Sequence, residues 1–326
     1  MPQLTLNPEY AEALEKITKL LGGEEQPKTR VGDIETRRTS TNRLWPTLLA
    51  QLPGTPDVER THVADIPSYD GYEVPLFRFA KKHISTRDES APAIVYIHGG
   101  GFFSLSVDAY SPLLSTYVSL SGVTMYAMDY RLSPEHRFPK PLEDSYACLK
   151  YVHDNASQLG VDAACIAIMG DSAGGGLCAG AAILARNRDL LLAKQIIING
   201  VLDDRTVNPR TMPEIEPFTT WTLEDNITAW DAYLEPGHEF KAYIAAPAAP
   251  ARLGNASGLA PLYLDVPALD VLRDEGVAYA GRLLKAGVEA ELHVYPGVPH
   301  SFEAFAPNIK LAKMAFENRV RAMTSF

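Results

Sequence analysis

Short apolar runs alternate with helical segments from residue 91 onward, and this alternation limits the fold more than any other feature of the sequence. Continuous apolar runs at 93–97, 123–128 and 165–169 are typical of parallel strands that are buried on both faces. Further strands are expected at 195–199, 260–265 and 289–295, and helices at about 110–121, 141–155, 174–187, 273–286 and 307–323. The alternation predicts an α/β fold with a mostly parallel central sheet and helices on both of its faces.

Two regions lie outside this alternation. Helices at 8–21 and 33–51 and strands at 58–66 and 72–80 are expected before it begins. The stretch 203–245 interrupts it and is rich in Pro, Thr and Trp, with a helical segment near 222–234. We therefore expect one domain over 1–326, with a helical cap formed by about 1–50 and 203–245.

The composition argues against several classes of partner. The chain of 326 residues carries a formal net charge of −10, which repels phosphate backbones, so no nucleic-acid partner is expected. No stretch reaches the roughly 18 apolar residues that a membrane span needs, and the N-terminus lacks the pattern of a signal peptide, so we expect a cytoplasmic protein. Three cysteines without CxxC spacing predict neither a disulfide framework nor a metal site.

A G-x-S-x-G motif at 170–174 follows an apolar strand and precedes a helix of small residues. A nucleophilic serine needs this context, because a sharp turn between strand and helix exposes its hydroxyl group and leaves no space for neighbouring Cβ atoms. The alternative is a plain glycine-rich packing or phosphate-binding turn. We expect Ser172 to be a nucleophile.

A second glycine-rich segment, His98-Gly-Gly-Gly-Phe, follows the strand at 93–97. Glycines let backbone N–H groups approach a developing oxyanion without obstruction. We expect the N–H groups of Gly100, Gly101 and Ala173 to donate to that oxyanion, and His98 to anchor the loop rather than to act as a base. A flexible turn without function is the alternative.

The base and the acid are sought at the carboxyl ends of the last strands, where catalytic groups of open α/β sheets gather. His300 lies in such a loop, whereas the other histidines fall in the glycine loop, in surface-like segments, in a helix or in a strand: His62, His83, His98, His136, His153, His238 and His293. Candidate acids after the strand at 260–265 are Asp265, Asp270, Asp274 and Glu275. Asp265 lies within the strand, and an acid in the first turn of a helix is favoured for capping alone, which leaves Asp270.

The motifs resemble the hormone-sensitive-lipase-like carboxylesterases of the α/β-hydrolase fold. The matching pieces, from about residue 60 to the C-terminus, are His98-Gly-Gly-Gly-Phe, Tyr130-Arg-Leu-Ser-Pro-Glu-His136, Gly170-Asp-Ser-Ala-Gly-Gly, Asp270-Val-Leu-Arg-Asp-Glu and His300-Ser-Phe. The resemblance implies a triad of Ser172, Asp270 and His300, an oxyanion hole of Gly100, Gly101 and Ala173, a cap over the site, and frequent homodimers. The chain departs from the family at Ser301, where glycine is usual, and at Val271, where proline is usual.

The expected activity is hydrolysis of small or short-chain acyl esters through an acyl-enzyme, with no metal and no organic cofactor. Pocket residues are expected among the apolar segments near the site: Phe102, Phe103, Trp221, Ser301 and Phe302. An acyltransferase or lactone-processing enzyme with the same triad is the main alternative. A non-catalytic ligand-binding protein is a further alternative, because plant gibberellin receptors are similar in scaffold but lack the catalytic histidine that this chain has as His300.

Overall fold

One sheet organises the computed structural model, which describes residues 4–20, 29–82, 90–206, 213–242 and 244–326. Its eight strands follow the order β1-β2-β4-β3-β5-β6-β7-β8. They are β1 (Val58–Pro67), β2 (Glu73–Lys81), β3 (Ala91–Ile97), β4 (Thr124–Met128), β5 (Val161–Asp171), β6 (Lys194–Ile198), β7 (Leu262–Pro267) and β8 (Ala290–Tyr295). β2 pairs antiparallel with β1 and with β4, and the other pairs are parallel. The prediction of a mostly parallel sheet is confirmed.

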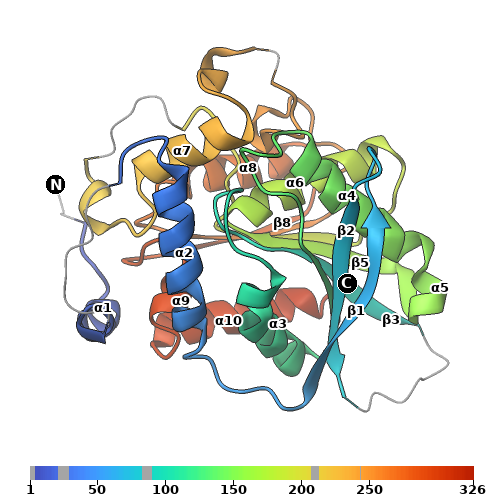
Figure 1. The fold of residues 1–326 in the computed structure, drawn as a ribbon, viewed down its shortest axis with the longest axis horizontal. Helices are drawn as coiled ribbons and strands as arrows, with labels where there is room; N and C mark the ends of the chain where they lie inside the picture. The colour runs from blue at the N-terminus through green and yellow to red at the C-terminus, as the bar shows by residue number, and fades with distance from the viewer. Residues whose placement is uncertain (1–3, 21–28, 83–89, 207–212, 243) are drawn as a thin grey trace.

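Helices cover both faces of this sheet (Figure 1). The α-helices of the described residues are α1 (Pro8–Leu20), α2 (Ile34–Leu49), α3 (Val107–Ser121), α4 (Lys140–Asp154), α5 (Ala156–Leu159), α6 (Ala173–Asn187), α7 (Leu223–Tyr233), α8 (Arg273–Lys285), α9 (Phe302–Phe305) and α10 (Lys310–Met323). The sequence had not indicated the one-turn helices α5 and α9, because four residues are too few to show a helical period.

Alternate residues of the central strand β3 enter different cores. Val95 and Ile97 pack with apolar residues of α4, α6 and α8. Ile94 and Tyr96 pack with residues of α2, α3 and α10 on the opposite face. A strand turns successive side chains to opposite faces, so a strand buried on both sides must be apolar at every position, as this one is. None of the described helices is long and apolar enough to cross a membrane.

A buried ion-pair network connects the last strands to the C-terminal helix. Arg319 of α10 is 1% exposed and donates to both carboxylate oxygens of Asp265 in β7, at 2.7 and 3.0 Å. Its Nη1 also donates to Glu303 Oε1 of α9 at 2.7 Å. The Arg319 guanidinium therefore connects β7, α9 and α10 through hydrogen bonds.

Replacing Arg319 with methionine is expected to lower the free energy of unfolding by about 3–5 kcal/mol, because two buried carboxylates lose their common cation. Arg321→Met is the matched control on the same helix, since Arg321 pairs with Glu291 at the surface and should cost less than about 1 kcal/mol. Urea unfolding of both variants measures the difference. Equal losses would show that the buried network contributes no more than a surface pair.

Candidate active site

The turn between β5 and α6 holds Ser172 in a strained conformation. The residue has φ +55° and ψ −122°, a region that non-glycine residues rarely occupy. The backbone is tightly packed on both sides of Ser172. A Cβ on Gly170 would lie 2.2 Å from the Gly174 carbonyl oxygen, and a Cβ on Gly174 would lie 2.1 Å from the Ile97 carbonyl oxygen. The glycines of the motif thus allow β3, β5 and α6 to meet where Ser172 stands at the carboxyl end of the sheet.

Three side chains from separate loops meet at this turn. His300 Nε2 lies 3.0 Å from Ser172 Oγ, and His300 Nδ1 lies 2.7 Å from Asp270 Oδ2. All three residues are buried. The other carboxylate oxygen of Asp270 accepts a hydrogen bond from the Leu272 amide at 3.0 Å, which holds the carboxylate toward the imidazole. The structure therefore brings together the serine, the histidine and the acid that the sequence selected.

The other candidate acids have different partners. Asp265 is bound to Arg319, and exposed Asp274 accepts from its neighbour Arg273 at 2.7 Å. Glu275 is buried and accepts from the amides of Leu202 and Asp203. Burial raises the pKa of the Glu275 carboxyl group well above its ordinary value, although these hydrogen bonds oppose the shift. Asp270 alone among the four has a hydrogen bond to His300 in the described residues.

The environment of His300 favours a positive charge on its ring. Burial alone would lower the pKa of the imidazole, but the charge and hydrogen bond of Asp270, together with the charges of Glu303 and Asp171, outweigh burial and raise the pKa above its ordinary value. The Asn199 side-chain amide nitrogen lies 3.2 and 3.3 Å from the two ring nitrogens. No role was predicted for Asn199. The available signal was its position at the end of the strand expected at 195–199, and in the structure it directly follows β6, the neighbour of β5.

Two hydrogen-bonded carbonyl groups orient the glycine loop. His98 Nδ1 donates to the Gly99 carbonyl oxygen at 2.7 Å, and the Ser104 amide donates to the Gly100 carbonyl oxygen at 2.9 Å. Both peptide units are trans, so their N–H groups, on Gly100 and Gly101, point away from those carbonyl groups. Both glycines line the same cavity as Ser172. His98 thus anchors the loop through its ring, and burial lowers its pKa.

The third expected donor, the Ala173 amide, is the first N–H of α6 and directly follows Ser172. The first amides of a helix have no partner within the helix and favour nearby negative charge. Three N–H groups at this end of the sheet can therefore serve an oxyanion.

A cavity of about 150 Å³ opens over Ser172 and His300. The remaining residues that line it come mainly from α2, the glycine loop and the segments around Trp221 and Ser301: Ser40, Thr41, Leu44, Trp45, Gly100, Gly101, Leu105, Tyr110, Thr220, Trp221, Ser301 and Phe305. Of the expected pocket residues, Trp221 and Ser301 line this cavity. Ser301 has φ +54°, in the left-handed region that glycine adopts most easily. The serine thus adopts the backbone conformation that suits the glycine usual at this position.

The other three expected pocket residues lie in the core, which corrects that expectation. Phe102 stacks on Tyr233 with ring centroids 4.3 Å apart, and Phe103 packs against Trp221 at 6.5 Å. Phe302 lies in an apolar cluster with Tyr295. Aromatic residues beside a catalytic motif suggested a pocket, but which side of the backbone they face is a matter of tertiary packing.

The expected cap is only partly placed over the cavity. Arg37 of α2 pairs with Asp225 of α7 at 2.7 Å, and Arg38 donates to the Phe103 carbonyl oxygen at 2.6 Å. α2 supplies cavity residues, whereas α1 packs elsewhere, with Tyr10 in the cluster around Phe302. Residues 1–3, 21–28, 207–212 and 243 of the expected cap lie outside the described residues.

His238 lies in a buried cluster of charged side chains. The expectation of a surface position is wrong for His238, which is fully buried with Nδ1 3.1 Å from Asp204 Oδ2. Arg252 donates to the same carboxylate at 2.6 Å, so burial of His238 follows from an ion-pair cluster that no local pattern indicated. His83 lies outside the described residues. Among the residues that the structure describes, no cluster of His, Cys, Asp or Glu could hold a metal ion.

Comparison with known proteins identifies a family. Residues 94–304 match the model of a family described by its alpha/beta hydrolase fold. Carboxylesterase NlhH of Mycobacterium tuberculosis is 33% identical over 67% of this chain and 68% of its own length. Ethyl acetate hydrolase of Pseudomonas putida is 31% identical over 72% of both chains. The solved structure of a bacterial heroin esterase superposes with a TM-score of 0.86, at 32% identity, over 98% of this chain and 97% of its own.

Asp270→Asn is expected to lower the pKa of His300, because the carboxylate raises that pKa by stabilising the imidazolium. NMR titration of histidine-labelled protein measures the shift. Asp274→Asn is the matched control, since Asp274 bonds to Arg273 and should leave the His300 titration unchanged. An unchanged pKa in Asp270→Asn would show that this carboxylate does not control the imidazole.

Proposed function

The chain belongs to the α/β-hydrolase fold family, and from that premise we propose that it hydrolyses short-chain acyl esters with Ser172, His300 and Asp270. The coarser assignment, an ester hydrolase of the carboxylesterase class, comes from its relatives. The single observation that supports the proposed mechanism is the pair of hydrogen bonds that His300 makes: Nε2 lies 3.0 Å from Ser172 Oγ, whose proton it can accept, and Nδ1 lies 2.7 Å from Asp270 Oδ2, to which it can donate.

Acylation begins when Ser172 Oγ attacks the ester carbonyl carbon and its proton passes to His300 Nε2. The imidazolium that forms is stabilised by the Asp270 carboxylate at Nδ1. The same proton then goes to the leaving alcohol, and the acyl group remains on Ser172. Water repeats the sequence: His300 takes its proton, hydroxide attacks the acyl carbon, and the acid leaves as Ser172 Oγ regains a proton.

The negative charge of each tetrahedral intermediate develops on the former carbonyl oxygen. The N–H groups of Gly100, Gly101 and Ala173 are proposed to donate to that oxygen. The direction of these N–H groups is set before the substrate binds. The Gly99 and Gly100 carbonyl groups are held by hydrogen bonds, and the Ala173 N–H group belongs to the first turn of α6. Donors that need no reorganisation contribute most to such catalysis, and loss of one typically costs a factor of about 10²–10³ in kcat.

Substrate size is proposed to follow from the small volume of the cavity over Ser172. Its volume of about 150 Å³ is small against the roughly 300–1,000 Å³ of drug-sized ligand pockets. Trp45 and Leu44 of α2 and Trp221 line it, so we propose that α2 and the segment leading into α7 form the roof. Such a roof excludes an aggregated lipid surface and favours acyl chains of about two to eight carbons.

Ser172→Ala is expected to abolish ester hydrolysis, with a loss of several powers of ten in kcat, because members of a triad act as a unit. An organophosphonate supplies the complementary measurement: the wild type should be labelled once per chain at Ser172, and His300→Ala should react far more slowly. Mass spectrometry identifies the labelled residue. Equal labelling rates in the wild type and His300→Ala would exclude His300 as the base, whereas no labelling of the wild type would favour a non-catalytic binding protein.

Hydrolysis of p-nitrophenyl esters is expected to be fastest, by kcat/KM, at short chains of about two to eight carbons and to fall for longer chains. Each buried methylene improves binding by about 0.8 kcal/mol until the wall is reached. Initial rates below the critical micelle concentration measure the profile. Efficient hydrolysis of emulsified long-chain triglyceride would contradict an enclosed pocket and indicate a lipase.

A further inference from the structure

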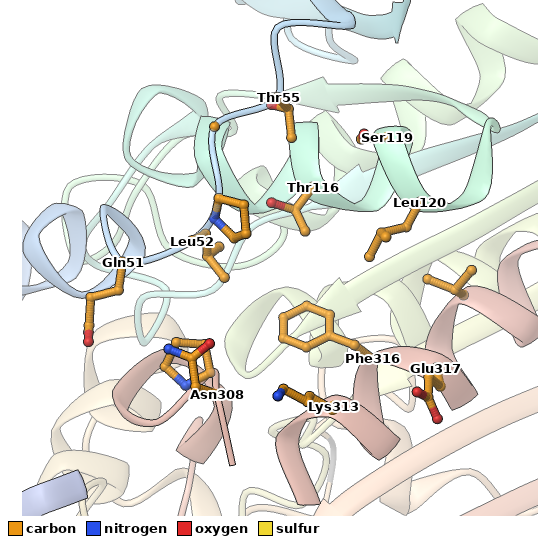
Figure 2. Close-up of a pocket in the computed structure, with 14 residues that line it drawn as sticks. Gln51, Leu52, Thr55, Thr116, Ser119, Leu120, Asn308, Lys313, Phe316 and Glu317 are labelled. Atoms are coloured by element: carbon orange, nitrogen blue, oxygen red, sulfur yellow. The ribbon is translucent and has the colours of Figure 1, made fainter. Parts of the chain in front are cut away.

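A second, larger cavity lies near the catalytic one. This outer pocket has a volume of about 470 Å³, and its walls are the residues after α2, the C-terminal half of α3, the residues before α10 and α10 itself. Figure 2 shows the side chains of Leu52, Leu120 and Phe316 pointing toward one another across it. Together with Pro53, Pro307 and Val320 they make the outer pocket largely apolar. Its size is that of a ligand site, and the proposed mechanism does not use it.

A narrow space separates the outer pocket from the catalytic cavity. This neck has a volume of about 10 Å³. Leu52 and Phe316 line both the neck and the outer pocket. Trp45 and Ser301 line both the neck and the cavity over Ser172. Shared wall residues at each end place the three spaces in a row, which leads from the catalytic serine to the surface between α3 and α10.

We propose that Leu52 and Phe316 close the catalytic cavity toward the outer pocket and thereby set the greatest acyl-chain length that the enzyme accepts. The outer pocket is then a site for the far end of an unbranched acyl chain once the neck is open. This inference rests on the proposed function, because it concerns the acyl group of the same esters.

The neck is too small for an alkyl chain. Its volume admits about one water molecule, so a methylene chain cannot pass unless the walls move. Leu52 and Phe316 are the apolar side chains that stand between the neck and the outer pocket, because they line both spaces. The opposite wall contains Asp171, which is held by Tyr110 at 2.8 Å and by Tyr96. Truncating Leu52 or Phe316 would therefore widen the neck without disturbing the residues beneath Ser172.

Polar atoms line part of the neck. Glu303 and Trp45 line it, and each has one buried polar atom, Oε2 and Nε1, without a hydrogen-bond partner among the described residues. A water molecule can satisfy such atoms, whereas an alkyl chain would leave them unpaired at a cost in binding. Burial also raises the pKa of Asp171 to about 6. The neck therefore disfavours the binding of an alkyl chain, whereas the apolar outer pocket beyond it would favour that binding.

The test uses Phe316→Ala and Leu52→Ala separately, because either change widens the neck and the two residues come from different segments. The measured quantity is the ratio of kcat/KM for p-nitrophenyl dodecanoate to that for the butanoate. Each methylene buried beyond the neck is worth about a factor of four, so the ratio should rise at least about tenfold over the wild type in both variants. Met314→Ala is the matched control, since exposed Met314 lies on α10 and should leave the ratio unchanged.

A second substitution tests where the chain goes. Leu120 lines the outer pocket and is 58% exposed, so Leu120→Asp is compatible with folding and places a charge in the path of an alkyl chain. Phe316→Ala combined with Leu120→Asp should lose the gain on dodecanoate. Thermal unfolding of each variant confirms that it is folded before its rates are compared.

The outcomes separate this inference from the proposed function. If the wild type and Met314→Ala hydrolyse no acyl ester, the proposed function fails. If they hydrolyse butanoate and folded Phe316→Ala and Leu52→Ala keep the wild-type ratio, the neck does not limit chain length and this inference alone is overturned. A gain that persists when Leu120→Asp is added would overturn it too, because the chain would then follow another path.

Discussion

The close approach of α6 to the central strands is the constraint on which the site depends. A Cβ on Gly174 would lie 2.1 Å from the Ile97 carbonyl oxygen, and one on Gly176 would lie 2.2 Å from the Val201 carbonyl oxygen. Without side chains at these positions, the helix can begin directly behind β5 and force Ser172 to φ +55°. The strain persists because strands buried on both faces surround the turn. A rigid strand end is also what a precisely placed nucleophile requires.

The groups that surround Ser172 come from segments far apart in the chain, and charge holds them in place. Ser172 and His300 are 128 residues apart. Arg319 holds Asp265 of β7 and Glu303, just after His300, in one buried network, so the segments that carry Asp270 and His300 are fixed relative to each other. The same concentration of buried carboxylates favours the imidazolium form of His300, because Glu303 and Asp171 add to the effect of Asp270. The buried ion pairs and the charges that act on His300 are therefore parts of one arrangement.

Access to the serine depends on a helix that precedes the sheet in the chain. α2 reaches the site through Arg37, which pairs with Asp225, and through Arg38, which donates to the Phe103 carbonyl oxygen. These contacts place Trp45 at the boundary of two spaces, the catalytic cavity and the neck. One helix thus lines both spaces, and under the proposed function changes in α2 would affect substrate size without contact with Ser172, His300 or Asp270.

The sequence by itself determined the features that depend on local backbone chemistry. Apolar runs and helical periods predicted the strands and long helices, because burial on one or two faces imposes a period on the chain. The glycines around Ser172 and after His98 predicted tight turns, because only glycine tolerates such close contacts. Tertiary structure alone decided which distant side chains meet: Asn199 beside His300, His238 beside Asp204, and Phe102 and Phe302 in the core. Contacts of this kind depend on how whole elements pack, and no spacing along the chain encodes them.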